Sequence, residues 1–315
     1  MKNKDYIYYI GERAHLFDFT LGLFQNYDQQ AKFILSQLRE RQLLDPSVSI
    51  LELGCGSGML ISLLTDRLGD SANIIGIDIS SEMVDMAKVR CGSKKVKFYV
   101  KDATQFLRDC KSTFDCIIFL FNFIQGFSNF RQAFTFLSLV RERLSTNGIA
   151  VFDWHNEPVF ERLHPQGIRT RLEMPFRLGK GKTICYISSY YYGVEKEMSC
   201  YFKVQPQGAG VANLITRHRL HTFNSRVMKW ILTRSGLNTT LEVEDYAGSR
   251  FYENSSERCI SIVQAMRDPK RLEEMVKQLF IDAGACPVSL GIVGSYKDTF
   301  ARPDWGDIDL LVILP

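Results

Sequence analysis

Three glycines, Gly54, Gly56 and Gly58, occupy alternate positions in the sequence ILELGCGSGML at residues 50–60. One apolar run precedes them and another follows, so they lie where a strand would pass into a helix. Residues without a Cβ let the backbone approach a ligand closely, and N–H groups at the start of a helix can point at it. The spacing therefore predicts a ligand-binding loop.

Acidic residues stand beside this loop and at the ends of the next two apolar runs. Glu52 precedes the glycines, Asp78 ends the run 73–78, and Asp102 follows the run 96–100. Such carboxylates can accept hydrogen bonds from ribose hydroxyls or from the amino group of adenine. The dinucleotide fingerprint Gly-x-Gly-x-x-Gly fails at its third glycine, and the sequence beside the loop offers no Arg or Lys for a phosphate. A positively charged adenosine ligand fits better; the alternative is that the acids only cap helices.

Alternating strands and helices position these residues. We predict strands at 48–53, 73–78, 96–100, 114–121 and 148–154, and helices at 59–68, 82–90, 103–108 and 129–144. Apolar strands alternating with helices predict an α/β fold with a parallel sheet covered on both faces. Beyond residue 154 we expect an antiparallel β insertion over about 156–222, with strands at 183–192, 198–205 and 214–222. A helix at 225–235 and strands at 240–245 and 259–266 follow.

The segments LELGCGSG, GIDIS, KDATQF and FDCIIFLFNFIQGF, in this order, resemble class I S-adenosylmethionine (SAM) dependent methyltransferases. The resemblance covers about residues 29–266 and implies a Rossmann-like, doubly wound sheet with SAM as the cofactor. It implies that the glycine loop passes the methionine part of SAM, that Asp78 binds the ribose and that Asp102 holds the adenine edge. The cofactor contacts it implies are Glu52, Gly54, Cys55, Gly56, Gly58, Asp78, Ile79, Met83, Asp102, Ala103, Phe119 and Leu120. We expect Cys55 to pack in the loop and not to act as a nucleophile.

The antiparallel insertion resembles that of glycine and deoxyamino-sugar N-methyltransferases, which implies a small-molecule acceptor, with an amine as the methylated group. Asp153 and His155 leave the fifth predicted strand on the ligand side, so we expect one of them to assist deprotonation. The expected acceptor contacts are Asn122, Gln125, Trp154, Asn156 and Tyr9. Two alternatives stay open: an RNA or protein acceptor, and a binding module that holds SAM without catalysis.

A second motif lies in the tail GIVGSYKDTFARPDWGDIDLLVIL. Gly294 and Ser295 follow an apolar run, and Asp307 and Asp309 open another and share one strand face. This arrangement resembles polymerase-β-type nucleotidyltransferases, which implies an incomplete α+β segment at 268–315 after a methyltransferase domain at 1–267. The two aspartates would be metal ligands, but the third carboxylate that the family needs is missing. We therefore expect no nucleotide transfer, with Mg²⁺ a cofactor only of a complete domain.

The amino-acid composition argues against some classes of partner. The chain has 315 residues, of which 45% are hydrophobic and 23% charged, and a net charge of +4. These are values of a soluble globular protein, and no apolar stretch is long enough for a membrane span, so we expect no membrane partner. The small charge, without aromatic and basic residues interleaved, argues against nucleic acid. Eight cysteines without a CxxC pair predict reduced thiols in a cytoplasmic protein, and a homodimer is left open.

Overall fold

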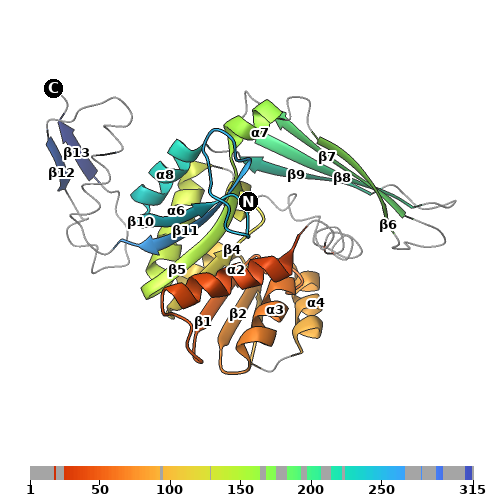
Figure 1. Ribbon diagram of the computed structural model, residues 1–315, viewed down its shortest axis with the longest axis horizontal. Helices are drawn as coiled ribbons and strands as arrows, with labels where there is room; N and C mark the ends of the chain where they lie inside the picture. Colours follow the sequence, from red (N-terminus) through yellow and green to blue (C-terminus); the bar gives the residue numbers. More distant parts are fainter. Residues whose placement is uncertain are drawn as a thin grey trace.

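The computed structural model describes residues 18, 25–92, 95–127, 129–163, 168–174, 183–192, 197–206, 214–221, 224–266, 278, 289–293 and 309–313. A seven-stranded sheet, in the order β10-β11-β5-β4-β1-β2-β3, forms the centre (Figure 1). Its strands are β1 (Ser49–Leu53), β2 (Asn73–Asp78), β3 (Lys97–Val100), β4 (Phe114–Phe119), β5 (Leu144–His155), β10 (Leu237–Val243) and β11 (Arg258–Ala265). The helices around it are α2 (Tyr27–Glu40), α3 (Met59–Leu68), α4 (Ser81–Cys91), α5 (Ala103–Asp109), α6 (Phe130–Arg143) and α8 (Ser225–Arg234).

Parallel pairing among β1 to β5 brings the carboxyl ends of these strands to one edge of the sheet. Glu52 near the end of β1 pairs with Gly76 on β2 and with Ile118 on β4. Strand β11 is antiparallel to both of its neighbours, β5 and β10. The predicted parallel sheet is confirmed, and the loops after its strands gather where ligands bind in such sheets.

Strand β5 shows why helices cover both faces of the sheet. Ile149 and Val151 belong to an apolar cluster with α2 and α3, whereas Phe152 and Trp154 belong to a second cluster with α5, α6 and α8. Successive side chains of a strand point to opposite faces, so a continuous apolar run needs cover on both sides. Figure 1 shows this layering, with α2 and α3 on one face and α6 and α8 on the other.

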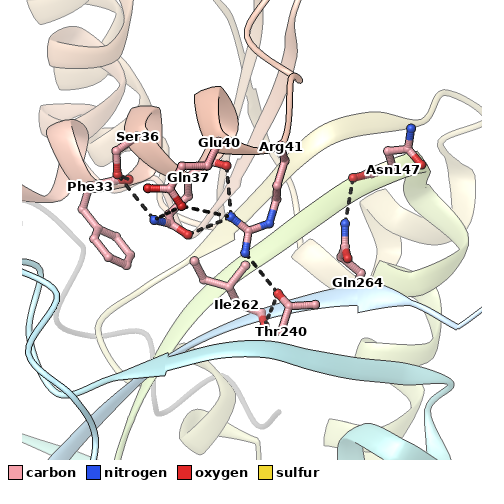
Figure 2. Close-up of polar contacts among 9 residues, drawn as sticks. All are labelled: Phe33, Ser36, Gln37, Glu40, Arg41, Asn147, Thr240, Ile262 and Gln264. Atoms are coloured by element: carbon pink, nitrogen blue, oxygen red, sulfur yellow. Dashed lines mark hydrogen bonds and ion pairs between the residues drawn. The ribbon is translucent and has the colours of Figure 1, made fainter.

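Helix α2, which the sequence analysis did not predict, is fixed to the antiparallel edge of the sheet (Figure 2). Its first turn is capped by Asn26, whose side chain accepts the N–H of Gln29 at 3.0 Å. At the other end, Arg41 donates to Gln37 Oε1 at 2.8 Å and to Thr240 Oγ1 at 3.3 Å. The register of β10 against β11 shifts between Thr239 and Leu241, so this contact is made at a β-bulge.

The insertion is a separate antiparallel sheet of four strands in the order β6-β7-β8-β9. It follows α7 (Glu157–Leu163) and contains β6 (Ile168–Met174), β7 (Thr183–Tyr192), β8 (Glu197–Pro206) and β9 (Leu214–His221). Only three strands were expected, although the sequence IRTRLEM at 168–174 alternates larger apolar or Thr residues with charged ones, as a half-buried strand does. Strand β9 contacts the 3₁₀ helix η2 (Phe123–Gly126) after β4, and the sheet extends beyond the central one (Figure 1).

Two short strands near the C-terminus, β12 (Ser289–Val293) and β13 (Asp309–Ile313), form an antiparallel pair. They confirm the two strands expected there, with Val293 opposite Asp309. The nucleotidyltransferase-like assignment of 268–315, and the division into domains at 267, stay predictions. Among the described helices, none is long and apolar enough to span a membrane.

Candidate cofactor and acceptor site

The glycine loop between β1 and α3 uses a backbone conformation that side chains disfavour. Gly54, Gly56 and Gly58 have φ angles of 73°, 51° and 74°, all in the left-handed region. The N–H groups of Gly54 and Cys55 both donate to the carbonyl of Ile77, at 2.7 and 2.9 Å. The loop is therefore curled and tied to the end of β2.

The three glycines differ in what surrounds them. A Cβ at Gly54 would lie 2.9 Å from the ring of Phe123, and one at Gly58 would lie 2.9 Å from Cβ of Ala87. A Cβ at Gly56 would meet no heavy atom of the described residues within 4 Å. Gly54 and Gly58 are thus needed for packing, while Gly56 presents bare backbone on an open side that a ligand can approach.

Asp78 is buried at the end of β2, beside this open face. Its Oδ2 accepts the N–H of Gly56 at 2.8 Å, and its Oδ1 accepts the N–H of Ser80 at 2.9 Å. Burial raises the pKa of the Asp78 carboxyl, while hydrogen bonds from Ser80, Gly56 and Ile79 oppose that rise. The carboxylate is held in place with lone pairs left to accept ligand hydroxyls.

Glu52 is a second buried acid beneath the loop, only 3% exposed. Its Oε2 is buried and has no hydrogen-bond partner among the described residues. Burial, and next the negative charge of Asp78, raise the pKa of the Glu52 carboxyl well above its ordinary value. Two acids buried together, one with an unpaired oxygen, favour a ligand that carries positive charge.

The adenine end of the expected site lies where β2 and β3 finish side by side. The N–H of Lys101 donates to the carbonyl of Asp78 at 2.8 Å, which holds the two strand ends together. Asp102 is exposed and caps α5 by accepting the N–H of Gln105 at 3.0 Å, the capping role weighed as the alternative. Ile79 is 36% exposed at this edge. The other expected contacts, Met83, Phe119 and Leu120, are buried, and Ala103 is partly buried.

Asp153, expected as a base, is fully buried and engaged by three donors. Oδ1 accepts the N–H of Asn122 at 2.7 Å, and Oδ2 accepts the hydroxyl of Tyr246 at 3.1 Å and pairs with Arg258 Nη2 at 3.0 Å. Burial acts to lower the pKa of Arg258, but the charge of Asp153 and the contribution of Tyr246 together more than offset this effect, so the pKa is raised. A substrate proton would have to displace one of these partners, which argues against Asp153 as the base, and its role in catalysis stays a prediction.

That loop is strained where it leaves β4. Phe121 and Asn122 have φ angles of 61° and 59°, a conformation that Asn tolerates and that is unusual for Phe. The hydrogen bond from the Asn122 N–H to Asp153 holds this geometry. Asn122 Oδ1 is buried without a hydrogen-bond partner among the described residues. Backbone strain held by a hydrogen bond to a buried carboxylate, beside an unpaired acceptor atom, is a feature that concentrates at functional sites.

Comparison with known proteins agrees with the geometry of the cofactor side. The family model described as a methyltransferase domain matches residues 50–148, from the first strand to the start of the fifth. Residues 50–148 are therefore similar to a methyltransferase domain. The S-adenosylmethionine-dependent methyltransferase from Clostridium acetobutylicum has a similar structure, with a TM-score of 0.65 at 18% identity over 80% of this chain and 97% of that chain. The fold is thus the Rossmann-like fold of class I SAM-dependent methyltransferases.

Two curated relatives of the methyltransferase domain act on different acceptors. The malonyl-[acyl-carrier protein] O-methyltransferase of Bacillus anthracis is 32% identical over 155 residues, which are 47% of this chain and 55% of that protein. The dTDP-3-amino-3,4,6-trideoxy-alpha-D-glucopyranose N,N-dimethyltransferase of Streptomyces venezuelae is 23% identical over 235 residues, 72% of this chain and 90% of that protein. The chain therefore spans about half the length of the first relative and most of the second.

Gln125 of the methyltransferase domain is buried against the main chain of His155. Its Oε1 accepts the N–H of His155 at 2.8 Å, and its Nε2 donates to the carbonyl of His155 at 3.3 Å. Both polar groups of the amide are used in this way, which argues against a contact between Gln125 and the acceptor, and that contact stays a prediction. Gln125 instead fixes the backbone of His155, whose side chain is half-buried.

Trp154 and Asn156 were also expected at the acceptor, and the structure places both in the interior. The indole Nε1 of Trp154 donates to Ser261 Oγ at 3.0 Å. Asn156 Nδ2 donates to the carbonyls of Glu253 and Ser256, at 2.7 and 3.0 Å. These contacts tie β5 to β11 and to the segment before it, which argues against Trp154 and Asn156 as acceptor contacts, and that role stays a prediction.

Arg90, at the end of α4, is a residue that the sequence reasoning missed. Its Nη1 donates to the carbonyl oxygen and to Oγ of Ser57, in the middle of the glycine loop, and its Nη2 pairs with Asp18 at 3.0 Å. The expectation that no Arg or Lys lies beside the loop is therefore wrong. The separation of 33 residues between Ser57 and Arg90 gave no local signal for this contact.

Several expected site residues fall where the structure gives no side-chain description. Tyr9, Gly294, Ser295 and Asp307 lie outside the described residues, and Asp309 is described only through the backbone of β13. Within the described part of the chain, no group of three or more His, Cys, Asp or Glu side chains could hold a metal ion. The metal site of the tail stays a prediction.

Proposed function

We propose that this chain transfers the methyl group of SAM to the nitrogen of a small-molecule amine. The observation that carries the proposal is the buried pair Glu52 and Asp78 beside the open face of Gly56. SAM brings an ammonium and a sulfonium, so it would complement two buried carboxylates. A pyrophosphate would instead place negative charge against them.

The residues present fit SAM. Asp78, held by the N–H groups of Gly56 and Ser80, would accept the ribose hydroxyls. The unpaired Oε2 of Glu52 would face the cationic amino-acid end, and Ile79 and Asp102 would border the adenine. When bound, SAM supplies an electrophilic methyl group.

On the acceptor side, Asn122 provides the argument for an amine. Its buried, unpaired Oδ1 would accept a hydrogen bond from an amine N–H and so orient the nitrogen lone pair. A carboxylate acceptor has no proton to donate to this oxygen and would repel it. His155, held through its main chain by Gln125, would take the proton that the methylated nitrogen loses.

The names of the two curated relatives supply the two acceptor classes that the decisive experiment compares. The Streptomyces venezuelae protein is named for an amino sugar, and the Bacillus anthracis protein for malonyl-[acyl-carrier protein]. The chain should be incubated with deuterium-methyl SAM and either a panel of amino sugars or malonyl-acyl-carrier protein, with products read by mass spectrometry. We expect label on the nitrogen of an amine. Label only on the carrier-protein substrate would overturn the amine assignment, and no SAM binding in calorimetry would overturn the whole proposal.

For the tail we infer half of a metal–triphosphate site with no transfer activity of its own. The register supports this inference, because Val293, which precedes Gly294 and Ser295, lies opposite Asp309. Two carboxylates on one strand face leave Mg²⁺ mostly bound by water. Mg²⁺ is therefore no cofactor of methyl transfer in this proposal.

A further inference from the structure

We propose that Arg90 and Asp18 are positioning residues for the cofactor, which together clamp the glycine loop in its ligand-binding conformation. This inference rests on the proposed function, because the loop they hold is the one that would bind SAM. It adds two residues that lie far from the glycine motif in sequence and that no strand-end pattern indicates.

The clamp is a closed set of contacts between three residues. One guanidinium nitrogen of Arg90 donates to both the carbonyl oxygen and the hydroxyl of Ser57. The other donates to Asp18 Oδ2 at 3.0 Å, and the Ser57 hydroxyl donates to Asp18 Oδ1. The guanidinium fork can hold both partners at once because its donors are fixed in one plane.

The position of Ser57 explains what the clamp controls. Ser57 lies between Gly56 and Gly58, both in the left-handed region, where glycine has far more backbone freedom than other residues. No side chain caps the start of α3 at Gly58, and the peptide between Ser57 and Gly58 has one local anchor, the Gly58 N–H that donates to the carbonyl of Cys55 at 3.0 Å. By binding the Ser57 carbonyl, Arg90 fixes that peptide plane and thereby reduces the freedom that a ligand would otherwise have to remove.

Asp18 has a separate electrostatic task. The hydroxyl of Tyr27 interacts with the same group of charges. Burial is the largest cause of its raised pKa, Glu52 and Asp18 raise that pKa further, and Arg90 lowers it. Arg90 and Glu52 thus act on the same hydroxyl with opposite sign, so an unpaired Arg90 charge would oppose a cationic ligand beside the glycine loop. The Asp18 carboxylate neutralises it and leaves the pocket acidic.

Two variants separate these tasks by calorimetry with S-adenosylhomocysteine, which lacks the sulfonium charge, and with SAM. Arg90→Lys keeps the positive charge but loses the planar guanidinium that binds Ser57 and Asp18 at once. It should therefore lower the affinity for both ligands about tenfold, the loss expected for a hydrogen bond to a charged group. Asp18→Asn leaves Arg90 unpaired, so it should weaken SAM several-fold more than S-adenosylhomocysteine.

A matched control lies on the same layer of helices. Arg67, in the last turn of α3, contacts Asp28 near the start of α2 in a comparable but more exposed ion pair. Arg67→Lys and Asp28→Asn should leave both affinities unchanged. Thermal unfolding without ligand checks that every variant is folded, and Asp18→Asn keeps the test valid if Arg90→Lys does not fold.

The outcomes are distinct. If the unsubstituted chain binds neither ligand, the proposed function fails and the clamp fails with it. If it binds both and the clamp variants match the control variants, the clamp alone is overturned. Equal weakening of SAM and S-adenosylhomocysteine by Asp18→Asn would overturn the charge role of Asp18.

Discussion

The backbone N–H of Gly56 donates to the Asp78 carboxylate at 2.8 Å, across a separation of 22 residues. Gly56 is also the glycine whose added Cβ would meet no described atom. One residue therefore orients the carboxylate expected to bind ribose and leaves the space above it open. The end of β2 and the glycine loop act as a single unit because of this contact.

Alanine substitutions at Gly56 and Gly58 should separate ligand binding from folding. Gly58→Ala places a Cβ 2.9 Å from Ala87 at a left-handed position, and we expect a loss of about 3 kcal/mol of unfolding free energy. Gly56→Ala meets no neighbour and should lose only about 1 kcal/mol, yet bind SAM far more weakly. Denaturant unfolding and calorimetry measure the two effects. Unchanged SAM affinity in Gly56→Ala would show that the open face is not the ligand side.

SAM binding should strengthen as pH rises. Burial and Asp78 raise the pKa of Glu52 above its ordinary value of 4.5, so the free protein keeps this carboxyl protonated at pH values where the unfolded chain ionises it. The contribution of Glu52 to the stability of the free protein is therefore fully present below its ordinary pKa and is lost as pH rises through the raised pKa. A bound cation favours the ionised form, so SAM affinity should increase as pH rises from the ordinary pKa of the Glu52 carboxyl toward its raised pKa, with proton release on binding.

Calorimetry in buffers of different ionisation enthalpy measures that proton release directly. Glu52→Gln should abolish the part of the pH dependence that Glu52 contributes, while Asp78, whose pKa is also raised by burial, keeps its own share. A pH dependence identical in Glu52→Gln and the unsubstituted chain would exclude Glu52 from the linkage.

Asp153→Asn should destabilise the fold more than it impairs chemistry directly. It leaves Arg258 without its buried counter-charge, which costs about 3 kcal/mol or more. Tyr246→Phe removes one hydrogen bond from the same carboxylate and should cost about 1 kcal/mol. Urea unfolding compares the two. If Asp153→Asn is stably folded but has lost its turnover, Asp153 would be assigned as the base.

His155→Gln should lower kcat by about 10²-fold, the usual contribution of a general base, and leave SAM affinity unchanged. The acid limb that a histidine base would give to the kcat profile should disappear in this variant. The readout is the pH profile of turnover with the amine identified by the mass-spectrometric panel. A profile that keeps its acid limb would assign proton removal to another group or to water.

The tail aspartates should have no part in methyl transfer. Asp309 begins a strand of a two-stranded sheet that shares no strand with the seven-stranded sheet of the cofactor site. Asp307→Asn combined with Asp309→Asn should therefore leave the methyl-transfer rate unchanged, and the chain should transfer no nucleotide from ATP. Radiolabelled ATP and the methylation assay test both parts. Slower methylation by a folded double variant would mean that the tail contributes to the site.

The cofactor side could be predicted because its signals are local. Helix α3 and strand β2 have the bounds that their apolar patterns predict, and the acids Glu52 and Asp78 follow from position at strand ends. The acceptor side was harder because several consecutive residues of β5 were expected to face one ligand. A strand alternates its faces, so Trp154 had to point away from the side that Asp153 occupies.

Partners far apart in sequence were beyond local patterns. Asp18 and Arg90 are separated by 72 residues, and the partners of Asp153 come from Asn122 and from β11. The partner of such a charged group cannot be assigned from the sequence, because only the fold brings the two residues together. Burial of Gln125 was hidden for the same reason, because its amide is satisfied by the main chain of a different strand.

The reversed direction of β11 determines where the rest of the chain is attached. Arg258 starts this strand opposite His155 at the ligand edge, and Gln264 lies opposite Ile149 toward the far edge. The N–H of Met266 then donates to the carbonyl of Gly236 at 2.8 Å, which secures the exit point. Met266 thus lies at the end of the sheet opposite the glycine loop, so a substitution at this position should leave the cofactor pocket intact.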